Sequence, residues 1–416
     1  MVACNSLLAE EFRSKAASMG YTMSQEATED VGYKTGFLNF DFLNGYITEE
    51  FDSSTGISTP YFNLGLTDGA FVSFIGNTGT GKTTLVCQIA ANIARQFPTT
   101  TIFEDNIEGG LTHKRRMTLS QFSPEEYRKR YIIRNTGVTI ENFYKRISMI
   151  FDEKMKHVDK YLYDTGHKDM YGNPIMKLEP TIYIIDSIAM MMPEKFSEED
   201  ELSGNSAAAA AARVMAQTFR QIIPKLKAAN IILIGINHIL EDVQMSIMPK
   251  KNPVPYLKQG ERMPKGRTIT FLANNIVRVD NGPKLKEDEG YKVEGSVTEI
   301  TLVKSRSSGI KTATRLIYDF ANGFDPWLSL LQYLKDNKFI SGAGVSLYLS
   351  DDVDKKYKFS YGTFRNKIIE SEEFRKFFLN STLLKLKSIP KNRDIEANSL
   401  PEELTTPLIS DDVTKY

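Results

Sequence analysis

The stretch FVSFIGNTGTGKTTLVCQIA, residues 71–90, decides how the rest of this 416-residue chain is organised. It begins with apolar residues that predict a buried strand and ends with apolar residues at helical spacing. Between the two lies Gly76-x4-Gly81-Lys82-Thr83, the phosphate-loop pattern. Glycines let the backbone approach an anion closely, and the N–H groups at the helix start point toward it. Because strand and helix flank the pattern in the required order, a chance glycine-rich turn is disfavoured and a nucleoside triphosphate is the expected ligand.

The residues of this loop are expected to have distinct roles. Lys82 supplies a positive charge for the β- and γ-phosphates, and the Thr83 hydroxyl is placed to bind Mg²⁺. The remaining residues offer backbone N–H groups. The predicted nucleotide-binding residues of the loop are Gly76, Asn77, Thr78, Gly79, Thr80, Gly81, Lys82, Thr83 and Thr84.

The overall composition is that of an ordinary globular protein, with 41% hydrophobic and 25% charged residues. Its 52 basic and 52 acidic residues cancel, so a nucleic-acid partner would require a local basic patch. The two cysteines, Cys4 and Cys87, form no disulfide framework or zinc spacing and favour a reducing, cytoplasmic setting. No apolar run is long enough to predict a membrane helix, and no membrane partner is expected.

Apolar strand patterns alternate with helical patterns along the chain. Strands are predicted at 100–103, 131–134, 181–187 and 231–237, and long helices at 140–156 and 207–228. This alternation predicts an α/β fold with a mostly parallel central sheet. Further β-like segments at 275–279, 298–303 and 315–320 extend the sheet, residues 46–68 read as a polar connector, and residues 157–179 read as an inserted loop or hairpin. Four regions are expected: an N-terminal helical arm (1–34), a core (35–335), a small helical C-terminal domain (336–390) and a disordered tail (391–416).

Polar residues follow several of these strands at the edge where ligands bind in open α/β sheets. The strand at 100–103 ends in EDNIE, so Glu104, Asp105 and Glu108 are candidates to orient or deprotonate an attacking water. Asp186 lies at the end of the strand at 181–187 and is expected to hold Mg²⁺ through water. His238 is either an ordinary structural histidine or a sensor of the γ-phosphate.

Two basic groups lie later in the chain. The segment 244–268 contains a single acid, Glu261, and reads either as a loop that binds the DNA backbone or as a solvated basic loop. Its candidate DNA-binding residues are Lys250, Lys251, Lys258, Arg262, Lys265 and Arg267. Lys304 and Arg306 end the strand at 298–303, where they could reach a γ-phosphate in cis or across a subunit interface, or be ordinary strand-edge charges.

The order of these segments resembles that of RecA-family recombinases, and most of all the UvsX-type recombinases of bacteriophages. The resemblance extends from about Thr35 to Trp327. It is carried by the phosphate loop and by the segments IIDSIA (184–189), GINHIL (235–240), LVKSRSSG (302–309) and NGFDPWLSLL (322–331). It implies a RecA-like P-loop ATPase core with a short N-terminal helical arm and a small helical C-terminal domain.

The resemblance also implies an activity. It implies a DNA-dependent ATPase that uses ATP and Mg²⁺, forms helical filaments on single-stranded DNA and pairs it with double-stranded DNA. A single-strand-binding protein and a loader protein are candidate partners. Residues 193–205 and 243–268 correspond to the two DNA-binding loops of the family.

Individual roles follow from the matching positions. Glu108 best matches the water-activating glutamate, although one extra residue precedes it and keeps Glu104 and Asp105 as alternatives. His238 matches the γ-phosphate sensor, while Lys304 and Arg306 resemble the pair that reaches the ATP of the adjacent subunit. Further implied roles are phosphate binding by Lys82, Mg²⁺ binding by Thr83 and Asp186, and packing of Trp327 near the adenine.

Two other functions remain open at this stage. A hexameric replicative helicase shares this core, but its N-terminal domain is normally larger than the region before the phosphate loop. An ATP-gated scaffold that binds DNA or protein and hardly hydrolyses ATP is the non-catalytic alternative.

Overall fold

The computed structural model describes residues 30–52, 56–169, 172–197, 205–241, 256–264, 266–285, 294–306, 312–343, 346–350, 352 and 354–388. The helix expected within the N-terminal arm and the tail expected to be disordered lie outside these ranges.

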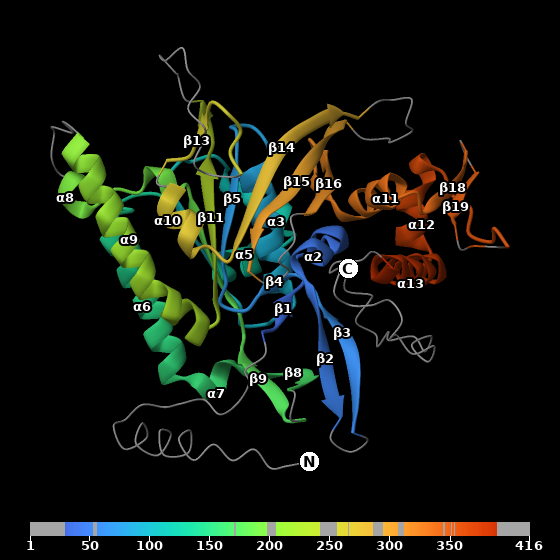
Figure 1. The fold of residues 1–416 in the computed structure, drawn as a ribbon, viewed down its shortest axis with the longest axis horizontal. Helices are drawn as coiled ribbons and strands as arrows, with labels where there is room; N and C mark the ends of the chain where they lie inside the picture. The colour runs from blue at the N-terminus through green and yellow to red at the C-terminus, as the bar shows by residue number, and fades with distance from the viewer. Residues whose placement is uncertain are drawn as a thin grey trace.

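A nine-stranded sheet forms the centre of the molecule (Figure 1). From β14 to β7 neighbouring strands are parallel, whereas β14 to β17 pair with one another antiparallel. The predicted α/β fold with a mostly parallel sheet is therefore confirmed. The spatial order is β17 (Gly323–Asp325), β16 (Thr312–Asp319), β15 (Gly295–Ser305), β14 (Asn275–Lys284), β5 (Phe71–Gly76), β11 (Ile231–His238), β10 (Thr181–Asp186), β6 (Ile102–Asn106) and β7 (Tyr131–Arg134).

Helices cover both faces of this sheet because its central strands are apolar on both sides. In β5, Val72 and Phe74 belong to the core beneath α3 and α4, whereas Phe71 and Ile75 belong to the core beneath α6, α9 and α10. Figure 1 shows α6 and α9 side by side along one flank. The bounds of these helices are α3 (Lys82–Arg95), α4 (His113–Ser120), α6 (Ile140–Lys156), α9 (Asn205–Ala228) and α10 (Gly266–Leu272).

A third core builds the C-terminal unit beyond the sheet, seen on the right of Figure 1. Phe364 and Phe378 are fully buried in it and pack 4.8 Å apart between ring centroids. The helices predicted in this region are found, and a β-hairpin that the sequence pattern did not predict joins them. The elements are α11 (Pro326–Asp336), β18 (Ile340–Ala343), β19 (Ser346–Leu349), α12 (Tyr361–Glu370) and α13 (Glu372–Ser388).

Two hairpins extend below the sheet in the view of Figure 1. The polar connector expected at 46–68 was wrong, because β2 (Tyr46–Asp52) and β3 (Ile57–Asn63) pair along their length there. The inserted segment contains a second hairpin, β8 (Leu162–Lys168) with β9 (Pro174–Leu178), which confirms the hairpin interpretation. A salt bridge of 3.0 Å from Lys177 Nζ to an Asp68 carboxylate oxygen fastens this second hairpin to the core.

Short elements complete the described chain. Among its helices, none combines the length and apolar content needed to cross a bilayer. The remaining elements are β1 (Gly32–Tyr33), α2 (Leu38–Asn44), β4 (Leu66–Thr67), α5 (Pro124–Arg130), α7 (Val158–Tyr161), a 3₁₀ turn (Ile188–Met190), α8 (Glu194–Ser197), β12 (Leu240–Glu241) and β13 (Glu261–Arg262).

Candidate nucleotide-binding site

The predicted phosphate loop connects β5 to α3, as the sequence pattern requires. Gly79 and Gly81 have φ angles of +79° and +84°, in the left-handed region that favours glycine. A Cβ atom at Gly79 would meet nothing within 4 Å, whereas one at Gly81 would lie 3.0 Å from the ring of Phe324. The loop is therefore open toward a ligand at Gly79 and packed against the protein at Gly81.

Lys82 bonds back to the backbone of the phosphate loop. Its ammonium group donates hydrogen bonds to the carbonyl oxygens of Gly76 (3.0 Å) and Asn77 (2.6 Å). Burial lowers the pKa of Lys82 to about 8, although the nearby carboxylates of Asp186 and Glu108 favour its charged form. The cation is thus held at the base of the loop, where a phosphate would meet it.

Thr83 and Asp186 meet beside the loop. The Thr83 hydroxyl donates a 2.7 Å hydrogen bond to Asp186 Oδ2, while the buried Oδ1 atom has no hydrogen-bond partner among the described residues. Burial raises the pKa of Asp186 to about 6, and the bond from Thr83 lowers it in part. An unpaired carboxylate oxygen next to a hydroxyl suits a hard cation such as Mg²⁺, so the residues present fit the expected metal.

Glu108 and His238 come together although 130 residues separate them. Both carboxylate oxygens of Glu108 lie within 2.8–2.9 Å of His238 Nε2. The backbone N–H groups of Ile107 and Glu108 donate to the Asp186 carbonyl oxygen at 2.7 and 3.1 Å, which holds the segment after β6 against the end of β10. The carboxylate, the histidine and the Thr83–Asp186 pair therefore share one edge of the sheet.

The other two acidic candidates are engaged elsewhere. Glu104 is buried in an ion pair with Arg116 and accepts a 2.8 Å hydrogen bond from the Tyr131 hydroxyl. Asp105 is buried against Arg146 and the Tyr183 hydroxyl. Of the three acids that the sequence left open, Glu108 is the one whose carboxylate contacts a second candidate site residue.

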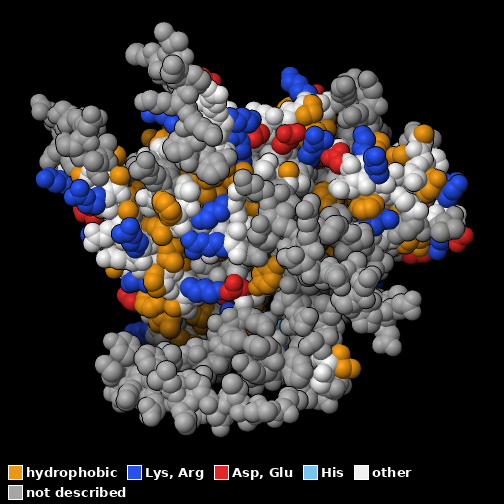
Figure 2. Space-filling model, in the orientation of Figure 1, with side chains coloured by type: hydrophobic (Ala, Val, Ile, Leu, Met, Phe, Trp, Pro, Cys, Tyr) orange, Lys and Arg blue, Asp and Glu red, His pale blue; other side chains and the backbone are white. Residues whose placement is uncertain are grey.

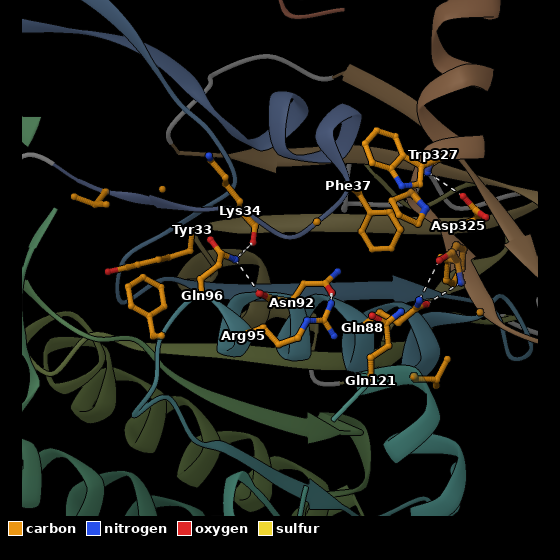
Figure 3. A pocket seen from close by; sticks show the side chains of 18 of the residues that line it. Tyr33, Lys34, Phe37, Gln88, Asn92, Arg95, Gln96, Gln121, Asp325 and Trp327 are labelled. Atoms are coloured by element: carbon orange, nitrogen blue, oxygen red, sulfur yellow. Dashed lines mark hydrogen bonds between the residues drawn. The ribbon is translucent and has the colours of Figure 1, made fainter. Parts of the chain in front are cut away.

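Trp327 lies away from the phosphate loop. It begins α11 and lines a cavity of about 850 Å³ on the outer side of α3, and none of the residues 76–84 lines that cavity (Figure 3). The aromatic side chains near Gly81 are Phe324 and Tyr318, whose rings stack with centroids 4.7 Å apart. Sequence reasoning missed this pair, although the run YDFANGF (318–324) carries the signal.

Lys304 and Arg306 face α10 rather than the phosphate loop of their own chain. Lys304 Nζ donates to the carbonyl oxygens of Thr270 (2.6 Å) and Ala273 (2.7 Å), and Arg306 donates to Phe271. In the strand register, Ile276 pairs with Lys304 on one side and with Ser73 on the other. Two strand spacings and three residues place the Lys304 backbone about 14 Å from Gly76.

This region has further features of a contact surface. Phe271, whose backbone carbonyl oxygen accepts from Arg306, is 71% exposed. Figure 2 shows Lys and Arg side chains on this face of the molecule around α10. We name Phe271, Lys304 and Arg306 the α10 surface.

Only part of the predicted DNA-binding segment lies within the described residues. Lys250, Lys251 and Lys265 fall outside them, as does the Arg267 side chain. Lys258 and Arg262 are exposed, and the segment around them is anchored to β14 because Glu261 forms an ion pair with Arg278 at 2.8 Å. Arg278 pairs with Ile75 in the sheet, so this anchor lies next to the start of the phosphate loop.

Comparison with known proteins gives one family. The model of the RecA N-terminal domain matches residues 177–324, from β9 to the start of β17. The RecA proteins of Haemophilus ducreyi and Mannheimia haemolytica are each 27% identical over 164 residues, which is 39% of this chain. The match spans about two-fifths of those relatives, 40% and 41% of their lengths. This chain is similar to RecA over part of its length.

The family match covers only some of the candidate site. Asp186, His238, Lys304 and Arg306 lie inside residues 177–324, whereas the phosphate loop and Glu108 lie outside. The nucleotide site is therefore supported by two separate observations. The matched residues carry the family likeness, and the loop carries its own sequence pattern and its contact with Asp186.

Proposed function

We propose that this chain is an ATP-dependent DNA recombinase that polymerises on single-stranded DNA and promotes homologous pairing and strand exchange. The observation that supports it most is the meeting of the phosphate loop, the Thr83–Asp186 pair and the Glu108–His238 pair at one edge of the sheet. The finer likeness to bacteriophage UvsX-type recombinases rests on GINHIL (235–240) and LVKSRSSG (302–309).

In this proposal, the loop N–H groups and Lys82 bind the phosphates of ATP. Thr83 and Asp186 hold Mg²⁺, which neutralises charge on the phosphate oxygens when it is bound. Glu108 accepts a proton from the attacking water, and His238 exchanges its bond to Glu108 for one to the γ-phosphate. Packing of the base against Trp327 stays part of the proposal, because the Phe324 ring beside Gly81 is buried.

Assembly of several subunits is proposed because the cations of the α10 surface lie too far from the phosphate loop of their own chain to contact a nucleotide there. Lys304 and Arg306 are cations at the far end of the sheet, and both bond to the backbone around the exposed Phe271. Charges of this kind stabilise a transferring phosphoryl group when a neighbouring subunit supplies them. ATP between subunits would then hold the filament, and hydrolysis would release it.

DNA binding is proposed for the basic segment at 243–268. Lys258 and Arg262 are exposed beside an anchor that reaches the nucleotide edge through Arg278. Contacts of Lys and Arg to phosphates give binding that is sensitive to salt and tolerant of sequence. Double-stranded DNA, a single-strand-binding protein, a loader protein and a cytoplasmic setting complete the proposal.

The test is the rate of ATP hydrolysis with and without single-stranded DNA, together with negative-stain microscopy of the same samples. Stimulation by DNA with helical filaments supports the recombinase. Stimulation with closed six-membered rings would identify a helicase motor instead. Absence of both stimulation and assembly would refute the proposed function.

A matched pair of variants tests the DNA segment. Lys258→Ala/Arg262→Ala should weaken binding to single-stranded DNA and reduce the slope of log affinity against log salt by about one per removed phosphate contact. Lys129→Ala is the control, because Lys129 is an exposed cation on α5. Equal slopes for the double variant and the wild type would remove these two residues from the DNA-binding surface.

A further inference from the structure

Gln88 forms an unusual bridge between α3 and β17. It lies on the helix that begins with Lys82 and is only 8% exposed. Its side-chain amide donates to the Phe324 carbonyl oxygen at 3.0 Å and accepts from the Phe324 N–H at 2.8 Å. The side chain therefore satisfies both backbone groups of one residue, as a neighbouring strand would.

Phe324 connects this bridge to the phosphate loop. Its ring is buried, stacks on Tyr318 and lies where a Cβ atom at Gly81 would come within 3.0 Å. Any movement of β17 would move the aromatic ring that packs against the last glycine of the loop. Gln88 thus fixes Phe324 relative to the same helix that carries Lys82 and Thr83.

The next residue connects β17 to the C-terminal unit. Asp325 caps α11, because its Oδ1 atom accepts from the backbone N–H groups of Trp327 and Leu328 at 2.9 Å each. Its other carboxylate oxygen lies 3.2 Å from Arg365 Nε on α12. Figure 3 shows Gln88, Asp325 and Trp327 around one cavity.

We propose that Gln88, Phe324, Asp325 and Arg365 form a link through which nucleotide occupancy at the phosphate loop and the placement of the C-terminal unit influence each other. Gln88 is a positioning residue in this link, since it acts through Phe324. The inference rests on the proposed function, because it requires that the loop binds ATP. Thermodynamic linkage makes the two effects equal. The factor by which nucleotide binding shifts the equilibrium between placements of the C-terminal unit is also the factor by which that placement changes nucleotide affinity.

The chain offers a built-in reporter for this link. Trp327 is its only tryptophan, and its backbone N–H is bonded to Asp325. The experiment titrates full-length protein with Mg²⁺ and a non-hydrolysable ATP analogue. It follows Trp327 emission, and equilibrium dialysis measures nucleotide binding in parallel.

The wild type should bind the analogue with a saturable change in Trp327 emission. Gln88→Leu keeps the size of the side chain but removes both bonds to Phe324. It should abolish the emission change and weaken binding about fivefold or more. Gln88→Glu keeps only the acceptor and should give an intermediate response. Gln96→Leu is the control, because Gln96 caps the C-terminus of the same helix but bonds to the Lys34 carbonyl oxygen.

Arg365→Gln provides a second route to the same answer, since Arg365 is half-exposed and its removal leaves the core packing intact. It should also reduce the emission change, and its effect should not add to that of Gln88→Leu in the double variant. A wild type that binds no nucleotide by dialysis would refute the proposed function itself. Binding without an emission change, or an unaltered change in both single variants, would overturn the link alone.

Discussion

The two ends of the central strands carry charged residues in different arrangements. At the carboxyl ends of β5, β6, β10 and β11, Glu108 bonds to His238 and Thr83 bonds to Asp186 across long sequence separations. At the opposite end, Lys304 and Arg306 bond only to backbone carbonyl oxygens of α10, as far as the described residues show. In the proposed function the first end receives the nucleotide, whereas the second end presents cations at the surface. In the proposed filament, the second end of one subunit completes the first end of its neighbour.

Replacing Glu108 tests the first end and should have the largest effect. Glu108→Gln keeps an acceptor for His238 but cannot accept a proton, so ATP turnover should fall about 10²–10⁴-fold while nucleotide binding persists. Steady-state turnover and equilibrium dialysis measure the two quantities. Glu125→Gln, on the exposed face of α5, is the control. Unchanged turnover in Glu108→Gln would show that another group activates the water.

Replacing Arg306 tests whether the second end acts on a neighbour. Arg306→Ala should reduce turnover of assembled protein about 100-fold, because one stabilising charge is lost at the transferring phosphate. Mixing Arg306→Ala with Glu108→Gln should restore part of the activity, since some interfaces then combine an intact Glu108 with an intact Arg306. A mixture no more active than its components would contradict action across an interface.

Lys304 makes the second end sensitive to pH. Burial and, to a smaller extent, the nearby Arg306 together lower the pKa of Lys304 to about 8, so its charge is present below that pH and lost above it. DNA-stimulated turnover should therefore fall about tenfold between about pH 7 and pH 9. Lys304→Arg should remove most of this fall, because a guanidinium stays charged. The same pH profile in Lys304→Arg would assign the titration to another group.

Two glycines of the phosphate loop, Gly79 and Gly81, differ in their surroundings. One faces open space and the other packs against a side chain. Both have positive φ, so alanine costs stability at each. Gly81→Ala also pushes against Phe324, whereas Gly79→Ala enters open space. Gly81→Ala should therefore be less stable than Gly79→Ala by about 1 kcal/mol. Thermal unfolding of the two variants measures the difference, and equal stabilities would contradict the packing role of Gly81.

The sequence predicted which candidate residues meet at one edge of the sheet, because their positions follow from local patterns. Apolar runs mark β5, β6, β10 and β11, and the polar residue after each run must fall at the same edge of a parallel sheet. The Thr83–Asp186 contact follows directly from that rule. The Glu108–His238 contact does not, because two loops of irregular length bring those side chains together.

Features that depend on packing between distant elements could not be read from the pattern. The Phe324 ring on β17 packs beside Gly81, although the two residues lie far apart in the sequence. The hairpin of β2 and β3 escaped notice because its strands are polar and lack an alternating apolar face.

The ammonium group of Lys82 donates to the carbonyl oxygens of Gly76 and Asn77 and to the Thr80 hydroxyl oxygen, so each of its three N–H donors has a partner within the protein. When Lys82 binds a phosphate, it therefore exchanges existing hydrogen bonds for new ones and gains none in number. This exchange limits how much Lys82 alone adds to nucleotide affinity. The same arrangement keeps the loop in its receptive shape at rest. Encounter with a nucleotide should consequently be limited by diffusion and partner exchange, with no slow folding of the loop around the ligand.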